Sequence, residues 1–286
     1  MADLDMKKVA EVVAISLKED AVSEDITTDS VVDENCEAIG EIETGRKGVL
    51  AGLDVAAEVF RQVDETLAVE KPAGDGEQVM PGRVVMRVEG RASSILKGER
   101  VALNLLSHLS GVATLTARFV EKAAAPNVDI LDTRKTTPGL RLLEKYAVRM
   151  GGGVNHRLDL SDRILIKDNH LALQDGGRRE RMGRAVSAAR EKYPGVTIEV
   201  EAQDLDDVVD ALEAGADIIM LDNMSPGELA RAVEIVGGRA RTEASGGVDL
   251  ESVEKIAASG VDSMSIGALT HSAPALDFSM EIRPRE

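Results

Sequence analysis

The sequence predicts an α/β protein in which a barrel-like C-terminal part follows a smaller α+β part. In the second half, short apolar runs alternate with amphipathic helical patterns, which is typical of parallel strands joined by crossover helices. The later strands recur about every 22 residues, the length of one βα unit in a (β/α) barrel. In the first half, shorter apolar segments are separated by glycine-rich turns, which favours a mixed α+β domain.

The first half begins with an amphipathic helix over residues 6–20. Apolar segments and glycine-rich turns follow, and residues 74–90 are interpreted as a plain β-hairpin. Residues 93–124 then predict one long or broken helix that connects the two parts. The expected boundaries are an N-terminal α+β domain over residues 1–110 and an α/β barrel domain over residues 111–272.

The second half predicts six strands, and a helix follows each of them except the last. The strands are expected at residues 128–133, 164–168, 197–202, 217–223, 240–245 and 261–269. The helices are expected at residues 140–150, 181–193, 205–215, 226–237 and 249–260. Because eight strands close such a barrel, six leave it open unless a short strand escapes detection, for example near residues 151–157.

Composition excludes several classes of protein. The chain of 286 residues has a formal charge of −17, which argues against general nucleic-acid binding because that needs a basic surface. Hydrophobic residues make up 43% of the chain, whereas aromatics make up 2%, so the core is expected to be aliphatic. No apolar run is long enough to cross a bilayer, and no secretory signal is visible. The single cysteine, Cys36, fits a reducing, cytoplasmic setting.

Residues 132–170 reverse the charge of the chain. They hold eight Lys and Arg residues against five Asp and Glu residues, and two of the four histidines. A cationic cluster in an acidic protein indicates a small anionic ligand, because its local field must overcome the global one. Arginine offers a planar fork to carboxylates and phosphates, and lysine a compact point charge. Arg141, Lys145 and Arg149, at helical spacing with Glu144, are interpreted as a solvated helix face.

Polar residues recur where the predicted strands end, which is where active sites of such barrels form. These residues are Arg134, Lys135, Lys167, Glu201, Asp222, Ser245, Gly246 and Gly267. Any one of these residues could instead form a structural salt bridge inside the barrel. Polar residues at the ends of five strands, however, favour an active site. Glu201 and Asp222 end successive strands, and two carboxylates without His or Cys suit Mg²⁺. Pairing with a nearby Lys or Arg is the alternative.

The last two strands are each followed by a glycine-containing turn, in "EASGGVD" (243–249) and "SIGALTHS" (265–272). Backbone N–H groups at such turns form anion sites, and barrels often bind phosphate there. Lys167 could instead form a Schiff base with a carbonyl substrate, as in aldolases, but the cations around it favour an anion.

The predicted helix over residues 93–124 carries Arg100, Asn104 and His108 at a spacing of four residues, which places them on one face. This face is either a solvated stripe or a means of presenting an arginine to a site across a subunit interface. The sequence leaves both interpretations open.

Several long motifs occur in an order that points to a known family. They are "DTRKTTPGLR" (132–141), "KYAVRMGGGVNHRLDLSD" (145–162), "ILIKDNH" (164–170), "IEVEA" (198–202), "IIMLDN" (218–223), "EASGGV" (243–248) and "SIGALTHS" (265–272). Together with "EDITT" (24–28) and "ERVALNLLSHLSGVAT" (99–114), they make nearly the whole chain resemble quinolinate phosphoribosyltransferase, the decarboxylating nicotinate-nucleotide pyrophosphorylase. The resemblance implies an N-terminal α+β sandwich domain, an open α/β barrel, and a C-terminal tail (residues 273–286) that returns to the first domain.

The resemblance also implies an activity. Such an enzyme transfers phosphoribosyl from phosphoribosyl pyrophosphate to the quinolinate nitrogen with decarboxylation, giving nicotinate mononucleotide, pyrophosphate and CO₂ in de novo NAD biosynthesis. It would use Mg²⁺ as its cofactor. It would form at least a homodimer whose active sites are shared between subunits.

The resemblance assigns roles to residues by motif position. The groups that would bind the two quinolinate carboxylates are Arg134, His156, Arg157 and Lys167, with Arg100 donated by the second subunit. Lys135 and Lys167 would also reach phosphate, and Glu201 and Asp222 would hold Mg²⁺ and the ribose hydroxyls; these four are the expected catalytic residues. The 5-phosphate pocket would be lined by Ser245, Gly246, Gly267 and His271.

Three other functions stay open. A related phosphoribosyltransferase could act on another pyridine or heterocyclic acid, an aldolase could use Lys167, and a non-catalytic sensor could bind a phosphorylated ligand without turnover. A substrate panel, borohydride trapping and a turnover assay separate them. The complete set of charged residues at the strand ends argues against a sensor that has lost catalysis.

Overall fold

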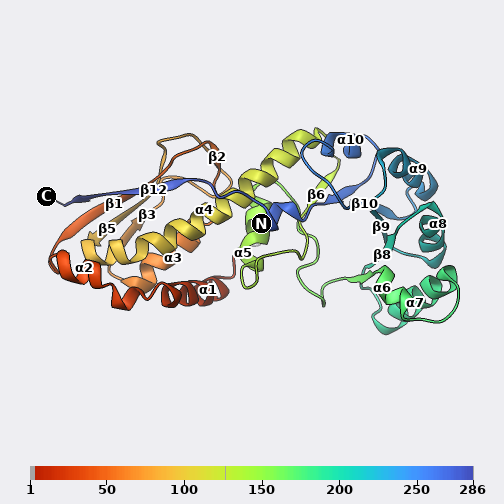
Figure 1. The fold of residues 1–286 in the computed structure, drawn as a ribbon, viewed down its shortest axis with the longest axis horizontal. Helices are drawn as coiled ribbons and strands as arrows, with labels where there is room; N and C mark the ends of the chain where they lie inside the picture. The colour runs from red at the N-terminus through yellow and green to blue at the C-terminus, as the bar shows by residue number, and fades with distance from the viewer. Residues whose placement is uncertain (1–3, 126, 286) are drawn as a thin grey trace. The chain divides into compact units, whose positions relative to one another are not determined.

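The computed structural model describes residues 4–125 and 127–285, which form two compact units. Unit 1 comprises the described residues of Met1–Ala117, Thr136–Gly152 and Leu269–Glu286, and unit 2 those of Arg118–Lys135 and Gly153–Ala268. Each unit has a sheet of its own, as Figure 1 shows.

Unit 1 is built on a four-stranded antiparallel sheet. Its elements are α1 (Met6–Glu19), η1 (Val22–Glu24), α2 (Ile26–Val31), β1 (Glu37–Thr44), β2 (Gly48–Val49), α3 (Leu53–Val63), β3 (Ala68–Glu70), β4 (Gln78–Val79), β5 (Val84–Arg91), α5 (Arg141–Met150), β12 (Phe278–Pro284) and most of α4 (Ala92–Ala123). The strand order is β12-β1-β5-β3. The C-terminal strand β12 lies antiparallel to β1, with Ala38 opposite Pro284 and Thr44 opposite Phe278.

Local signals explain where the helices of unit 1 begin. Asp5 accepts hydrogen bonds from the backbone N–H groups of Lys7 and Lys8 and so caps α1, and Asp25 of the "EDITT" motif caps α2 in the same way. The long helix α4 approaches α3 closely at Gly98, where an added Cβ would lie 2.8 Å from the Phe60 ring. The helix predicted over residues 93–124 is one continuous helix, α4.

Two interpretations of local sequence were wrong. Residues 74–90 do not form a hairpin, because β4 pairs with β2 whereas β5 pairs with β1 and β3. The glycine-rich turn was real, but a turn does not determine which strand its neighbours pair with. Helix α5 is not a solvated face either, because Glu144 is fully buried and Lys145 is 3% exposed. The Glu144 carboxylate accepts from the Thr137 N–H at 3.1 Å and lies 2.8 Å from His108 Nε2.

Unit 2 is built on a six-stranded, all-parallel sheet of order β6-β11-β10-β9-β8-β7. Its strands are β6 (Asp129–Leu131), β7 (Ile164–Ile166), β8 (Ile198–Ala202), β9 (Ile218–Asp222), β10 (Arg241–Ser245) and β11 (Ser263–Ser265). Its helices are α6 (Asp168–Ala172), α7 (Arg178–Lys192), α8 (Leu205–Ala214), α9 (Pro226–Val236) and α10 (Val253–Ala257), and α11 (Ala268–His271) crosses the unit boundary. Figure 1 shows α7, α8 and α9 in succession along β8, β9 and β10.

The six strands are those that the sequence predicts, and the predicted fold class is confirmed. Val154 adds an isolated parallel bridge to Leu131, within the segment where a short strand was suspected. Because β6 and β7 form the two edges of the sheet, the described strands leave the barrel open. No helix within residues 4–125 and 127–285 has the length and apolar character required to span a membrane.

Candidate active site

The parallel sheet of unit 2 has an apolar face and a polar face. In β8 the apolar residues Ile198, Val200 and Ala202 alternate with Glu199 and Glu201, and all five are buried. Since successive side chains of a strand point to opposite faces, the two glutamates share the face opposite the apolar residues. The strand register extends this polar face to the neighbouring strands through Asp222, Glu243, Ser245, Ser263 and Ser265.

Lys167, Glu201 and Asp222 form a group at the carboxyl ends of the strands, here called the rim group. Lys167 follows β7 directly, and its Nζ lies 3.3 Å from Glu201 Oε2. Burial raises the pKa of Glu201, and the nearby Asp222 and Asp168 carboxylates raise it further, while Lys167 opposes the shift. The structure therefore brings together the two carboxylates that the sequence assigns to a metal and the lysine that it assigns to catalysis.

A second polar group lies one pleat deeper on the same face. This inner group consists of Glu199 of β8, Glu243 of β10, and His156 and Arg163 from the loop before β7. His156 Nε2 lies 3.1 Å from Glu199 Oε2 and 3.5 Å from Glu243 Oε1, and Arg163 Nη1 lies 3.1 Å from Glu199 Oε2. Both glutamates are at most 1% exposed, so cations must compensate their charge within the protein.

Arg157 lies next to the inner group and is 8% exposed. Its Nη1 donates to the Arg163 carbonyl oxygen at 3.1 Å. Burial lowers the pKa of the Arg157 guanidinium, the charges of Arg134 and Arg163 lower it further, and Glu199 opposes them. Three arginines thus crowd together at one place, which is costly without an anion and suits the binding of carboxylates.

The backbone that carries these cations is held by Asp132, which directly follows β6 and is fully buried. Its two carboxylate oxygens accept from the His156 N–H at 3.0 Å and from Asn155 Nδ2 at 2.5 Å. In the adjoining turn the exposed Lys135 donates its backbone N–H to Thr133 Oγ1 at 3.0 Å. Asp132 therefore fixes the "NHR" segment to the end of β6.

The turn after β10 shows why glycine is needed in "EASGGV". Gly246 has a φ of +92°, and an added Cβ would lie 2.2 Å from Asn223 Oδ1. Asn223, which follows Asp222, donates its backbone N–H to the Ser245 carbonyl oxygen at 2.8 Å. The turns after β9 and β10 are therefore tied together, with Ser245 directly beside Asp222 in the strand register. Gly267 lies just beyond the neighbouring strand β11.

Gly246→Ala is expected to destabilise the protein by about 1–3 kcal/mol, because it combines a positive φ with a steric clash. Gly247→Ala is the matched control, since Gly247 also has a positive φ, of +61°, but has no atom within 4 Å of an added Cβ. Urea unfolding of both variants measures the difference. An equal loss in the two would show that the contact with Asn223 contributes nothing.

Two predicted site residues belong to unit 1 rather than unit 2. Arg100 lies on α4 with a side chain that is 64% exposed, and its nearest acidic partner is Glu99, at 4.0 Å. His271 ends α11, is exposed, and lies 2.7 Å from Ser272 Oγ. The other predicted residues all lie in unit 2.

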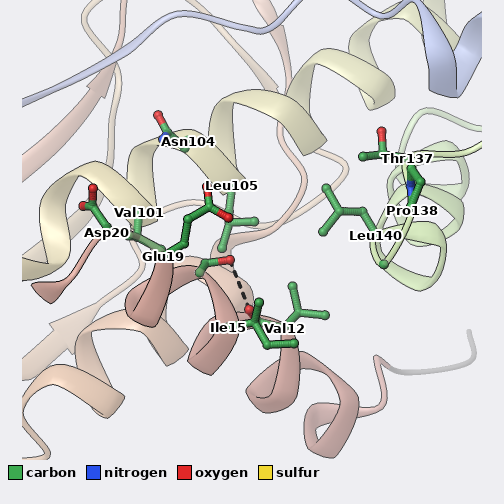
Figure 2. Close-up of a pocket in the computed structure, with 12 residues that line it drawn as sticks. Val12, Ile15, Glu19, Asp20, Val101, Asn104, Leu105, Thr137, Pro138 and Leu140 are labelled. Atoms are coloured by element: carbon green, nitrogen blue, oxygen red, sulfur yellow. Dashed lines mark hydrogen bonds between the residues drawn. The ribbon is translucent and has the colours of Figure 1, made fainter.

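Unit 1 also contains a pocket of about 390 Å³, drawn in Figure 2. It is lined by Val12, Ile15, Ser16 and Glu19 of α1 and by Asp20, which follows α1, by Val101, Asn104 and Leu105 of α4, and by Thr137, Pro138, Gly139 and Leu140. Its charged lining residues are acidic, so it does not suit an anionic substrate. The neighbour of Arg100 on the helix face, Asn104, contributes to this pocket.

Sequence reasoning missed Glu199, Glu243 and Arg163. The signal was present for the glutamates, because Glu199 and Glu201 stand two residues apart in a strand with no other polar residue before Gln203. Two carboxylates on one face of a buried strand require cations opposite them. The same argument applies to Glu243, two residues before Ser245.

Glu243 is expected to make the stability of the protein depend on pH. Burial and the Glu199 carboxylate raise the pKa of Glu243 to about 7, against the effect of His156. Because the folded protein holds this proton more tightly than the unfolded chain, Glu243 lowers the free energy of unfolding as the pH rises from about 4.5 to about 7. Glu243→Gln cannot ionise, so its melting temperature relative to wild type should increase over this range.

The matched control is Glu58→Gln in unit 1, which replaces another buried glutamate. Arg61 donates to the Glu58 carboxylate and lowers its pKa, so its contribution to stability is present at neutral pH and is lost on acidification. The melting temperature of Glu58→Gln relative to wild type should therefore stay nearly constant from about pH 4.5 to about 7 and increase as the pH falls below about 4.5. Parallel pH profiles for the two variants would contradict the assignment to Glu243.

Comparisons with known proteins identify the family of the chain. Residues 25–110 match the family described as quinolinate phosphoribosyl transferase, N-terminal domain, and residues 112–281 match its C-terminal domain. The chain is 43% identical over 265 residues to the "Probable nicotinate-nucleotide pyrophosphorylase (carboxylating)" of Bacillus subtilis, covering 92% of this chain and 90% of that protein. It is 39% identical over 292 residues to "Quinolinate phosphoribosyltransferase (decarboxylating) 2, mitochondrial" of Nicotiana glauca, covering 95% of this chain and 81% of that protein.

The fold is also that of solved relatives. The crystal structure of NadC from Streptococcus pyogenes superimposes with a TM-score of 0.94, at 41% identity and with 100% of each chain covered. Family models match both parts of the chain in sequence order, and the relatives are similar over nearly its full length. The chain therefore belongs to the quinolinate phosphoribosyltransferase family.

Proposed function

We propose that this protein transfers the phosphoribosyl group of phosphoribosyl pyrophosphate to the ring nitrogen of quinolinate, with loss of CO₂. The products are nicotinate mononucleotide and pyrophosphate, which places the reaction in NAD biosynthesis. The observation that supports this best is the crowding of Arg134, Arg157 and Arg163 beside the buried carboxylates of unit 2, because such a cluster suits a dianionic substrate. Membership of the family supports the same reaction.

The reaction needs positioned charge more than a strong base. The quinolinate nitrogen attacks the anomeric carbon as the bond from that carbon to the pyrophosphate oxygen breaks. The ring nitrogen is then positively charged, so it stabilises the electron pair left on the adjacent carbon when the carboxylate departs as CO₂, and a proton from water takes its place. Preorganised charges aimed at these positions are the main source of catalysis.

The residues of unit 2 divide this work by position. Arg134, His156, Arg157 and Lys167 bind the substrate carboxylates, and Lys135 and Lys167 also interact with phosphate groups. Lys167 Nζ forms an ion pair with Glu201 Oε2 at 3.3 Å, so the amine that a Schiff base would require is already engaged. Ser245, Gly246 and Gly267 line the 5-phosphate pocket, where backbone N–H groups can bind an anion. The proposal also assigns His271, a residue of unit 1, to this pocket.

Glu201 and Asp222 fit a Mg²⁺ site. The pKa of Glu201 is raised by burial and by the Asp222 charge, so a cation between them would relieve an unfavourable interaction. Both offer only oxygen, which Mg²⁺ prefers, and they leave positions for water and phosphate oxygens. When bound, the ion supplies positive charge for the departing pyrophosphate. The same carboxylates also accept from the ribose hydroxyls.

A homodimer with shared active sites belongs to the same proposal. Arg100 lies outside unit 2 on an exposed helix face, so a second subunit can receive it as a ligand for the substrate. A reducing, cytoplasmic setting also belongs to it, since the single cysteine, Cys36, is free.

A turnover assay tests the proposed reaction. The wild-type protein is incubated with quinolinate, phosphoribosyl pyrophosphate and Mg²⁺, and mononucleotide and CO₂ are both followed, with nicotinate in parallel. Equal release of both products from quinolinate alone supports the proposal. Turnover of nicotinate or another heterocyclic acid indicates a related transferase instead, and binding without turnover by the folded protein indicates a sensor.

A further inference from the structure

We propose that Glu199 is a positioning residue for the substrate-carboxylate site, in which its buried carboxylate orients His156 and anchors the segment that carries Arg157. The inference rests on the proposed function, because it assumes that Arg157 binds a carboxylate of quinolinate. Glu199 itself lies one pleat below the rim group and contacts the site only through other side chains.

The hydrogen bonds of His156 support this role. His156 Nδ1 accepts the backbone N–H of Arg157 at 2.8 Å, so the ring proton lies on Nε2. That Nε2 faces Glu199, at 3.3 Å from Oε1 and 3.1 Å from Oε2. Both ring nitrogens are thus engaged within the protein. His156 therefore connects Glu199 to the backbone of Arg157.

A second connection reaches the same arginine from the other end of the loop. Arg163 Nη1 contacts Glu199 Oε2 at 3.1 Å, and the Arg163 carbonyl oxygen accepts from Arg157 Nη1 at 3.1 Å. Glu199 thus holds both the backbone N–H of Arg157, through His156, and its guanidinium, through Arg163. The planar guanidinium of Arg157 binds a carboxylate well only when its orientation is fixed. Glu199 is therefore expected to affect substrate binding through these two connections to Arg157.

The charge of Glu199 contributes as well as its shape. It favours the charged form of Arg157, whereas Arg134 and Arg163 disfavour it. The second carboxylate, Glu243, lies farther from His156 Nε2, at 3.5 Å, and contacts neither arginine in the ion pairs of the described residues. Glu199 is therefore the inner-group carboxylate that pairs with Arg163 and favours the charged form of Arg157.

Glu199→Gln is the primary test, because it keeps the size of the side chain but has no charge and one acceptor oxygen. Calorimetry should show a rise of at least about tenfold in the Kd for quinolinate, with a Kd for phosphoribosyl pyrophosphate within about twofold of wild type. Glu58→Gln, which replaces another buried, arginine-paired glutamate, should leave both constants unchanged. Quinolinate binding within twofold of wild type in folded Glu199→Gln, or equal losses for both substrates, would overturn the inference.

A double-mutant cycle tests whether Glu199 acts through Arg157. In an Arg157→Ala background, Glu199→Gln should cause no further loss of quinolinate affinity, and fully additive losses would contradict the inference. If Glu199→Gln does not fold, Arg163→Gln removes one of the two connections at a side chain that is 23% exposed, and should raise the quinolinate Kd severalfold. An unchanged Kd there would overturn the inference equally.

The wild-type protein separates the two proposals. If it neither binds nor turns over quinolinate, the proposed function fails. If it turns over quinolinate while Glu199→Gln and Arg163→Gln behave like wild type, only the positioning role of Glu199 fails.

Discussion

Arg157→Ala is expected to lower kcat/KM for quinolinate by about 2–5 kcal/mol, which is roughly 30-fold to several thousand-fold. Arg157 is 8% exposed and lies against Arg163, so its guanidinium is already oriented and largely desolvated before substrate binds. Truncation would leave a substrate carboxylate without its partner. Steady-state kinetics with quinolinate varied at saturating phosphoribosyl pyrophosphate measures the effect.

Two further variants show whether this effect comes from the planar fork. Arg157→Lys keeps the charge but cannot bind a carboxylate with two parallel hydrogen bonds, so most of the activity should still be lost. Arg190→Ala is the matched control, and its turnover should stay close to wild type. Arg190 lies on α7 and pairs with Asp217 at 2.9 Å, so it is not part of the inner group. Near-wild-type turnover of Arg157→Ala would remove this arginine from the substrate site.

Mixing two inactive variants, Arg100→Ala and Lys167→Ala, is expected to restore activity. If Arg100 serves the site of the other subunit, each mixed dimer regains one intact site. In a twofold-symmetric dimer, purified mixed dimers should then have about one half of the wild-type activity, and a randomly paired mixture about one quarter. Co-expression with two different affinity tags gives dimers of known composition, and the turnover assay measures the recovery.

The expected recovery depends on two properties that have to be checked together. Sedimentation of the wild-type protein should show a dimer or a larger assembly, and each variant alone should be inactive but folded. If purified mixed dimers have no more activity than the single variants, Arg100 does not act in trans. It would then be part of a solvated helix face, as the alternative interpretation of the sequence states.

Features set by neighbouring residues were predictable from the sequence. The six strands of unit 2 follow from apolar runs of limited length, and the helices between them begin and end at local signals. Ser225 and Glu228 form a capping box at the start of α9, and Gly215 adopts a positive φ at the end of α8. Such signals act within a few residues, so one sequence is enough to locate them.

Predictions that depended on distant partners were less successful. The interpretation of residues 74–90 as a hairpin failed because β4 pairs with β2, which is far from it in sequence. The exposure expected for Glu144 failed because His108 and the Thr137 N–H supply partners that make its burial tolerable. In both cases the local pattern was present, and a long-range contact decided the outcome.

The sequence by itself determined the fold class, the family and the residue types that gather at the strand ends, because periodicity and motif order are properties of the chain. Only the tertiary structure decided which charges meet. Glu199 and His156 are 43 residues apart in sequence, and their contact connects Glu199 to Arg157 through the His156 ring. The cost of burying a charge depends on the groups that surround it after folding, which no local pattern specifies.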